Sequence, residues 1–251
     1  MSHEPVPPRL PPIPRQGEPD FEREVRRMFA RIVGRYSLFN HVSTFGNDLL
    51  WRPRALWEVD RRLARAPRVV VDLGCGPGDL SYLLSRHYPQ ARVLGLDFTE
   101  AMVHRALSRR RSGPEGTRMD FGVADALALP VRTSSVDLVT SAFLVRNIPH
   151  LERAFSEMRR VLRPGGMVLA LEITEPLPPW FRSLFHAYFD RVMPCLGELL
   201  TRDSAHRYLA ESLRHFPPRE TVCALMSRAG LQRVEARPQS AGIVTVFLGR
   251  A

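Results

Sequence analysis

The chain has 251 residues, a formal net charge of +10 and a hydrophobic share of 44%, a composition typical of a soluble globular protein with one large α/β domain. All 36 basic residues are arginine, which excludes a lysine Schiff-base mechanism. The three cysteines form no CxxC pair and the eight histidines are scattered, so we expect a reducing compartment, no disulfide framework and no metal site.

The N-terminal part is predicted to be a disordered leader followed by helices. Residues 1–20 hold seven prolines and no apolar signal segment, and no apolar run reaches the length of a membrane-spanning helix. We therefore expect a cytoplasmic protein. Helices are expected within 21–65: an amphipathic one from Phe21 to Gly34 and, after a loop at 35–47, a second one that Asn47 can cap.

From residue 68 onward, buried apolar runs alternate with helical patterns. The expected strands are 68–73, 91–97, 118–125, 136–143 and 167–173, and the expected helices are 79–87, 99–110 (capped by Thr99) and 150–162. This βαβ rhythm predicts a parallel sheet with helices on both faces.

The last third of the chain departs from this rhythm before it returns to it. Residues 174–219 are punctuated by prolines and are expected to form a helical insertion over the carboxyl edge of the sheet. A helix at 221–230 then precedes strands at 231–237 and 242–249, whose short connection favours an antiparallel pair. The sequence therefore predicts one α/β domain at 21–251 with a seven-stranded, mostly parallel sheet.

Three glycines, Gly74, Gly76 and Gly78, follow the first expected strand. A dinucleotide fingerprint needs its third glycine at position 79, where this chain has an aspartate. Asp79 would put negative charge at the helix N-terminus where a pyrophosphate should lie, and Asp72 adds a second carboxylate nearby. Two carboxylates repel a diphosphate but suit the ammonium and sulfonium groups of S-adenosylmethionine.

Acidic residues also follow the next two expected strands. Asp97 closes the second strand, where a carboxylate can accept ribose hydroxyls, although NAD enzymes place an acid there too. Asp125 follows the third strand, and its side chain with the Ala126 N–H could address the adenine edge; a turn or capping role is the alternative for both acids. Phe98 and Met102 either pack on the adenine or belong to the core. The expected cofactor is S-adenosylmethionine.

Sequence blocks outside this motif resemble the UbiE/COQ5 family of class I S-adenosylmethionine-dependent C-methyltransferases of quinone biosynthesis. The blocks are "VRRMFARIVGRYSLFNHVSTFG", "WR" at 51–52, "LVRNI", "EMRRVLRPGG", "LEI" and "YLAESLRHFP". The resemblance runs from about residue 21 to residue 249. It implies a Rossmann-like class I fold and a demethylmenaquinol, or the equivalent ubiquinone precursor, as the acceptor.

The resemblance also implies roles at matching positions. It places Arg146 and Asn147 near the acceptor ring with Tyr36 facing them, and Asp48 fits an Asp-or-His position of the family. The candidate cofactor-binding residues, from the motifs and the resemblance together, are Asp72, Gly74, Gly76, Pro77, Gly78, Asp97, Phe98, Met102, Asp125, Ala126 and Ala142. The chain departs from the family pattern at Ser37, Pro77, Ala142 and His206, which leaves cofactor binding intact but blurs the exact acceptor.

The expected reaction transfers a methyl group to a ring carbon of a polyprenylated hydroquinol. A phenol has a reference pKa near 10, so ionising it at neutral pH needs assistance. Arg146 stays protonated, so we assign it to stabilising the developing phenolate or to ordering a water, and Asn147 would fix that water or the quinol oxygen. Tyr36, Asp48 and His41 are candidates to relay the proton.

Other partners and functions stay open at this point. The aromatic residues of the insertion could wall a tunnel for an isoprenoid tail, touch a membrane surface or simply pack in the core; they are Trp180, Phe181, Phe185, Tyr188 and Phe189. A homo-oligomer is compatible with the sequence. Competing functions are methylation of another apolar molecule, such as a phospholipid amine or a phenolic metabolite, and cofactor binding without catalysis. Nucleic acid is not expected as a partner, because "NIPH" lacks the second proline and the aromatic residue of amino-methylating enzymes.

Overall fold

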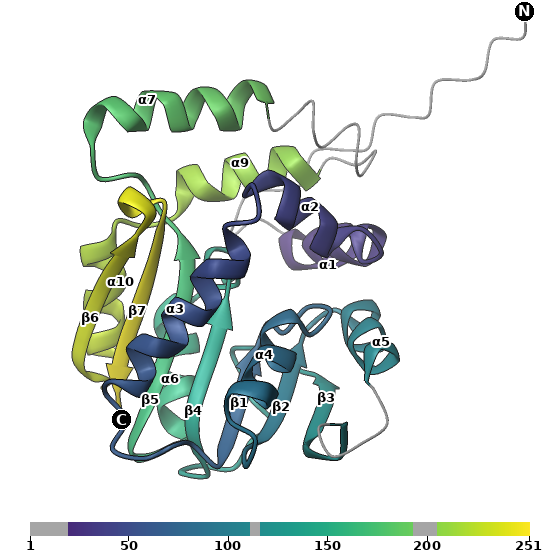
Figure 1. Ribbon diagram of the computed structural model, residues 1–251, viewed down its shortest axis with the longest axis vertical. Helices are drawn as coiled ribbons and strands as arrows, with labels where there is room; N and C mark the ends of the chain where they lie inside the picture. The colour runs from purple at the N-terminus through teal and green to yellow at the C-terminus, as the bar shows by residue number, and fades with distance from the viewer. Residues whose placement is uncertain (1–19, 111–115, 193–204) are drawn as a thin grey trace, which may run out of the picture.

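The computed structural model describes residues 20–110, 116–192 and 205–251, so the expected leader lies almost wholly outside the described residues. The centre of the fold is a seven-stranded sheet with the strand order β3-β2-β1-β4-β5-β7-β6 (Figure 1). The strands are β1 (Val69–Leu73), β2 (Arg92–Asp97), β3 (Met119–Val123), β4 (Val136–Ala142), β5 (Leu162–Ile173), β6 (Gln232–Gln239) and β7 (Val244–Arg250).

The strand directions confirm the expected sheet. Strands β1 to β5 pair in parallel, whereas β7 runs antiparallel to both β5 and β6. Because parallel strands end at the same edge, the loops that follow β1, β2, β3 and β4 gather at one end of the sheet.

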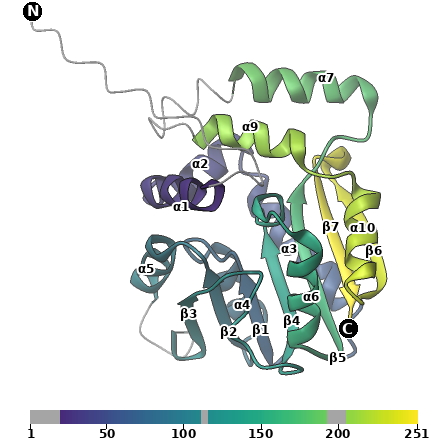
Figure 2. The ribbon, with the colours of Figure 1, turned by 180° about the vertical axis from the view of Figure 1, so that it is seen from behind.

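Helices cover both faces of this sheet, as expected. They are α1 (Phe21–Ile32), α2 (Tyr36–Ser43), α3 (Asp48–Asp60), α4 (Asp79–His87), α5 (Glu100–Arg109), α6 (Leu151–Val161), α7 (Pro179–Ala187), α9 (Ala205–His215) and α10 (Arg219–Arg228). Shorter turns are η1 (Gly116–Arg118), η2 (Val145–Asn147), the π-helical η3 (Tyr188–Val192) and η4 (Ser240–Gly242). Helices α3 and α4 pack in one hydrophobic cluster, and α6 and α10 pack in another on the opposite face, seen in Figure 2.

The central strands are mostly apolar because both of their faces are buried. In β1, Val70 belongs to the cluster with α3 and α4, and its neighbour Val71 belongs to the cluster with α6 and α10. Successive strand residues point to opposite faces, so a strand covered on both sides reads as a continuous apolar run.

The structure differs from the sequence prediction in two details, the loop before α3 and the helix caps at Asn47 and Thr99. The loop expected at 35–47 is wrong, because α2 occupies most of it and buries Phe39. Asn47 and Thr99 stand at helix N-cap positions, but neither side chain makes a capping hydrogen bond. Asn47 has helical backbone angles, and its amide donates back to the Thr44 carbonyl at 2.9 Å instead.

A third hydrophobic cluster lies at the carboxyl edge of the sheet. It joins the apolar stripe of α1 to Tyr208 of α9, and α1, α2 and α9 lie together above this edge in both views (Figures 1 and 2). Helix α7 lies beyond α9. Most of the described part of 174–219 is helical, and residues 193–204 with Cys195 lie outside the described residues.

Candidate active site

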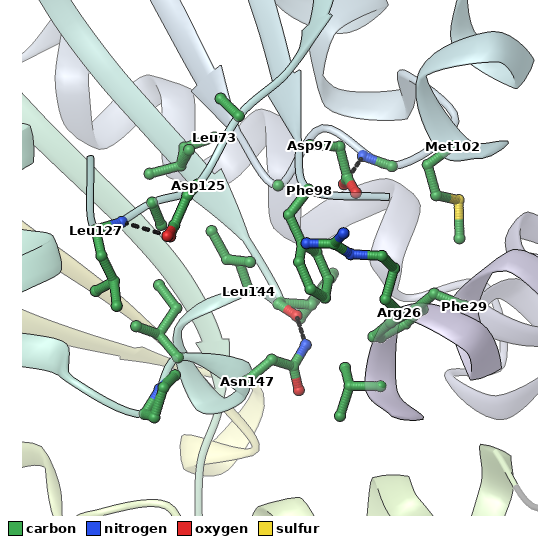
Figure 3. A pocket seen from close by; sticks show the side chains of 18 of the residues that line it. Arg26, Phe29, Leu73, Asp97, Phe98, Met102, Asp125, Leu127, Leu144 and Asn147 are labelled. Carbon is green, nitrogen blue, oxygen red and sulfur yellow. Dashed lines mark hydrogen bonds between the residues drawn. The ribbon is translucent and has the colours of Figure 1, made fainter. Parts of the chain in front are cut away.

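The largest concentration of expected site residues surrounds a cavity at the carboxyl ends of β1, β2 and β4 (Figure 3). The cavity holds about 900 Å³ of empty space, open solvent included. Ten of the expected residues line it: Tyr36, Gly74, Gly76, Asp97, Phe98, Met102, Asp125, Ala126, Ala142 and Asn147.

The glycine turn after β1 forms one wall of the cavity with its backbone. Gly74 and Gly76 have φ angles of +68° and +54°, in the left-handed region that favours glycine. A Cβ atom at Gly74 would lie 2.8 Å from the Leu144 side chain, whereas one at Gly76 would meet only Tyr36 Cε1, at 3.7 Å. Glycine at 76 therefore keeps space open between the turn and the Tyr36 ring.

Asp97 fastens this turn to the end of β2. Its Oδ2 accepts the Gly76 N–H at 2.9 Å and its Oδ1 accepts the Thr99 N–H at 2.8 Å. Burial raises the pKa of the Asp97 carboxyl, while these two backbone donors oppose that rise. Since each carboxylate oxygen can accept more than one hydrogen bond, Asp97 keeps acceptor capacity for ligand hydroxyls.

The cavity is also lined by an acid, Asp125, and by an unexpected cation, Arg26, on the opposite side of the view in Figure 3. Asp125 is exposed, and its Oδ1 accepts the Leu127 N–H at 2.8 Å, so the turn role is present alongside the position on the cavity wall. Arg26 of α1 also lines the cavity, with its guanidinium carbon 4.9 Å from the centroid of the Phe98 ring (Figure 3). Sequence reasoning missed Arg26 because nothing local separates it from the other arginines of α1.

Asp72 does not lie on the cavity wall, in contrast to the sequence expectation. Its carboxylate is fully buried and accepts hydrogen bonds from Ser81 Oγ at 2.6 Å and Thr140 Oγ1 at 3.0 Å. Burial raises its pKa to about 7, against the effect of these two donors. Asp72 therefore ties α4 and β4 to β1, and the next residue, Leu73, is the one that reaches the cavity.

The end of the glycine motif is also turned away from the cavity. The Pro77 carbonyl accepts Arg109 Nη1 at 2.6 Å, and the same nitrogen donates to Asp79 Oδ1 at 2.7 Å. A Cβ atom at Gly78 would lie 2.9 Å from the Tyr82 ring, so this glycine allows close packing of α4. The carboxylates that line the cavity are thus those of Asp97 and Asp125, in place of Asp72 and Asp79.

Arg146 lies behind the cavity wall in a buried ion pair. Its Nη1 donates to Oε1 of Glu172 at the end of β5, and its backbone N–H donates to Oε2 at 3.2 Å. Burial disfavours its charged form, but Glu172 outweighs this and the pKa of Arg146 is raised. Glu172, which sequence reasoning missed, is fully buried, and its signal is a carboxylate inside the apolar run "MVLALEI".

Asn147 and Tyr36 face the cavity in front of this pair. Asn147 Oδ1 accepts the hydroxyl of Tyr208 from α9 at 2.8 Å, and Asn147 Nδ2 lies 3.5 Å from the Phe143 carbonyl oxygen. Burial raises the pKa of Tyr36, with Arg146 acting in the opposite direction, so its hydroxyl stays protonated at neutral pH. Tyr208 was not named from the sequence, although it stands in the block "YLAESLRHFP".

Asp48 lies apart from the cavity wall in a cluster that joins α2 to α3. It is fully buried and accepts hydrogen bonds from His41 Nδ1 at 2.7 Å, Arg52 Nη1 at 2.8 Å and Thr44 Oγ1 at 3.0 Å. Burial would raise its pKa, but these donors outweigh burial and the pKa is lowered. Asp48 therefore holds α2 against α3 through these hydrogen bonds, and it does not line the cavity.

Comparisons with known proteins agree with this geometry. The model of the ubiE/COQ5 methyltransferase family matches residues 19–251. A demethylmenaquinone methyltransferase of Thermus thermophilus is 40% identical over 223 residues, covering 88% of this chain and 99% of the relative. A ubiquinone/menaquinone biosynthesis C-methyltransferase of Geobacter sulfurreducens is 34% identical over 226 residues, covering 90% of this chain and 87% of the relative.

Solved structures confirm the class I methyltransferase fold. A SAM-dependent methyltransferase of Thermotoga maritima aligns with a TM-score of 0.61 at 18% identity, covering 89% of this chain and 98% of that one. Phosphoethanolamine N-methyltransferase 2 of Haemonchus contortus, solved with S-adenosyl-L-methionine, aligns with a TM-score of 0.56 at 15% identity, covering 79% of this chain and 52% of that one. At these identities the likeness concerns the fold alone.

Proposed function

The chain belongs to the ubiE/COQ5 methyltransferase family, and on that premise we propose that it methylates a ring carbon of a demethylmenaquinol, or of the related ubiquinone precursor. The methyl donor is S-adenosylmethionine. The observation that carries the proposal is the gathering of the glycine turn, Asp97 and Asn147 around one cavity in a chain of this family.

The residues of the cavity fit the methyl donor. Asp97 can accept ribose hydroxyls, Asp125 lies where the adenine edge is expected, and Phe98 and Met102 offer apolar surface to the adenine. The open backbone at Gly76 leaves room for the methionine part beside Tyr36. When bound, this cofactor supplies an electrophilic methyl group, and the protein's residues supply position and polarity.

The remaining wall suits an apolar acceptor ring. Phe21, Val25 and Phe29 of α1 line the cavity together with Ile148 and Pro149, and the guanidinium of Arg26, on the same helix, lies over the Phe98 ring. An aromatic hydroquinol ring buries apolar surface here, which favours its binding over that of a charged acceptor.

Polar groups meet the acceptor at the η2 turn. Asn147 offers an amide and Tyr36 a protonated hydroxyl, and both can donate to an oxygen that gains negative charge as the ring carbon attacks. Arg146 contributes its charge from behind these two residues, as half of the pair with Glu172. Held in line with the methyl group, the ring carbon reacts without the entropy loss of a free encounter.

We further propose that the protein is cytoplasmic and touches a membrane surface to collect a polyprenylated acceptor, with the 174–219 insertion covering the acceptor site. Large exposed apolar side chains form a set that we call the apolar rim: Leu38, Phe45, Leu49, Leu50, Leu177, Trp180, Leu184 and Val192. The rings of Phe45 and Tyr188 lie 5.7 Å apart, so the α2–α3 turn and the end of α7 are neighbours. Within the described ranges, no helix is long and apolar enough to span a bilayer.

Acceptor profiling with isotopically labelled S-adenosylmethionine tests the proposed activity. We expect label in a prenylated demethylnaphthoquinol or the matching benzoquinol, and none in phosphatidylethanolamine or transfer RNA. Quinone analysis of cells that lack the protein should show the desmethyl quinone accumulating. Label that enters only the phospholipid or the RNA would contradict the proposal.

A further inference from the structure

The hydroxyl of Tyr208 is bonded to the amide that faces the acceptor side of the cavity. Tyr208 lies on α9, its side chain is buried, and its O–H donates to Asn147 Oδ1 at 2.8 Å. On the other side of the same amide, Nδ2 lies 3.5 Å from the Phe143 carbonyl oxygen (Figure 3).

These two contacts fix which way the amide points. A backbone carbonyl only accepts hydrogen bonds, so the amide nitrogen must lie on the side of Phe143 and the amide oxygen on the side of Tyr208. The contact with Phe143 uses at most one of the two N–H bonds of Asn147. The other N–H is left as a donor at the cavity wall.

The Tyr208 side chain is held in place by ring packing, and its hydroxyl is protonated. Its ring packs in the cluster of α1, with the rings of Phe21 and Phe29 each 6.4 Å away between centroids. Burial raises the pKa of the Tyr208 hydroxyl, with Arg146 acting against it, so the hydroxyl is protonated at neutral pH. In this arrangement the Tyr208 O–H donates to the Asn147 oxygen, whereas a flipped amide would set its oxygen against the Phe143 carbonyl oxygen.

We propose that Tyr208 is a positioning residue that locks the Asn147 amide with its N–H toward the acceptor, so that the site selects an acceptor oxygen that can take a hydrogen bond. This inference rests on the proposed methylation of a hydroquinol and names the group that orients its oxygen. Without the Tyr208 hydroxyl, the 3.5 Å contact with Phe143 is left to hold the amide, and any rotation presents the amide oxygen to the acceptor, where it repels a developing phenolate.

The test uses the full chain and separates Tyr208 from a merely structural residue. Tyr208→Phe removes the hydroxyl and keeps the ring, and we expect kcat/KM for the prenylated hydroquinol to fall about tenfold, the effect of losing one oriented hydrogen bond. Titration with S-adenosylhomocysteine should give the wild-type affinity. The matched control is Tyr88→Phe, which removes a buried hydroxyl bonded to Asp60 at 2.7 Å away from the cavity, and it should keep wild-type kcat/KM.

A double-mutant cycle tests whether Tyr208 acts through Asn147. Once Asn147→Ala has removed the amide, adding Tyr208→Phe should lower kcat/KM no further. Full activity of Tyr208→Phe, or an equal additional loss in the Asn147→Ala background, would overturn the proposal.

Two further outcomes stay informative. If Tyr208→Phe loses S-adenosylhomocysteine binding, Asn147→Asp carries the test, because it keeps an oxygen for the Tyr208 hydroxyl and replaces the N–H donor by a carboxyl oxygen. Wild-type kcat/KM in that variant would overturn the proposal. If the wild-type protein methylates no hydroquinol, the proposed function fails, and the same cycle is then run with the acceptor that takes up the label.

Discussion

Arg146 and Glu172 form a buried ion pair that joins the turn after β4 to the end of β5. The Glu172 carboxylate accepts hydrogen bonds from both the guanidinium and the backbone N–H of Arg146, so it holds this residue at two points. The pair is neutral as a whole, and neither of its residues lines the cavity, whereas Tyr36 and Asn147 do. We therefore propose that Arg146 acts on the acceptor through a fixed local field rather than by direct contact.

This arrangement predicts different results for single and double substitutions. Arg146→Ala leaves the Glu172 carboxylate buried without its partner, so the free energy of unfolding should fall by about 3–5 kcal/mol. Arg146→Met combined with Glu172→Gln removes both charges and keeps an oxygen for the backbone donors, so most of that loss should be recovered. Turnover should stay at least roughly tenfold below wild type in both variants. Urea denaturation and methyl-transfer rates measure the two effects, and recovery of turnover together with stability would show that Arg146 serves only the fold.

The glycine turn offers a second test with an internal control. Gly76→Ala places a methyl group in the space beside Tyr36, so we expect the affinity for S-adenosylhomocysteine to fall about tenfold or more. Gly165→Ala is the matched control, because Gly165 also has a positive φ, of +80°, but a Cβ atom there meets nothing within 4 Å. Both variants carry backbone strain of about 1–2 kcal/mol, yet only the first should lose affinity by calorimetry. Equal affinities would mean that the ligand does not approach the Gly76 backbone.

Much of the fold was predictable because its signals are local. The apolar runs of the central strands follow from burial of both sheet faces, and the helices between them have clear periodicity. Helix α2 was missed because Ser37, Asn40 and Ser43 are weak helix formers, and its stability comes from the tertiary burial of Phe39.

The site residues also divide into those with a local sequence signal and those that depend on contacts between distant parts of the chain. Gly74, Gly76 and Asp97 were found because a glycine turn after one strand and an acid after the next are local features. Glu172 and Tyr208 were missed because they contact Arg146 and Asn147 across 26 and 61 positions of sequence. Asp72 was expected at the cavity but its side chain lies off the wall, because with both faces of β1 buried the pattern does not reveal which face a side chain takes.

The buried Asp72 carboxyl predicts a pH dependence of stability. Its pKa is about 7 in the folded protein, against 3.8 for the free group, so between these values the folded state holds a proton that the unfolded state has lost. The free energy of unfolding should therefore fall as pH rises from about 4 to about 7, by at most roughly 1.4 kcal/mol per pH unit from this group.

Substitution isolates this contribution from that of other carboxyls, some of which act in the opposite direction. Asp72→Asn is neutral at every pH, so the wild-type-minus-variant difference should fall through this window and level off above it. Asp120→Asn, at an exposed site, is the control and should leave the pH profile unchanged. A difference that does not vary with pH in urea denaturation would mean that Asp72 is ionised throughout.

The apolar rim predicts how the protein meets its acceptor. Trp180 and Phe45 are 74% and 77% exposed, and burying two such rings in a lipid surface contributes about 1.5–3 kcal/mol each. We expect wild-type protein to float with vesicles of phosphatidylcholine and phosphatidylglycerol, and Trp180→Ser with Phe45→Ser to reduce that binding at least tenfold. Leu107→Ser, on α5, is the control and should float like wild type.

Salt and oligomeric state separate the possible meanings of this result. The net charge of +10 attracts anionic lipid, and salt screens that attraction, whereas the contribution of the two rings should persist at high salt. Wild-type protein that stays with the soluble fraction under all conditions would contradict membrane contact. If gel filtration then showed a dimer that the double variant converts to a monomer, the apolar rim would be a self-association surface, because the same rings would be buried by a second copy of the chain.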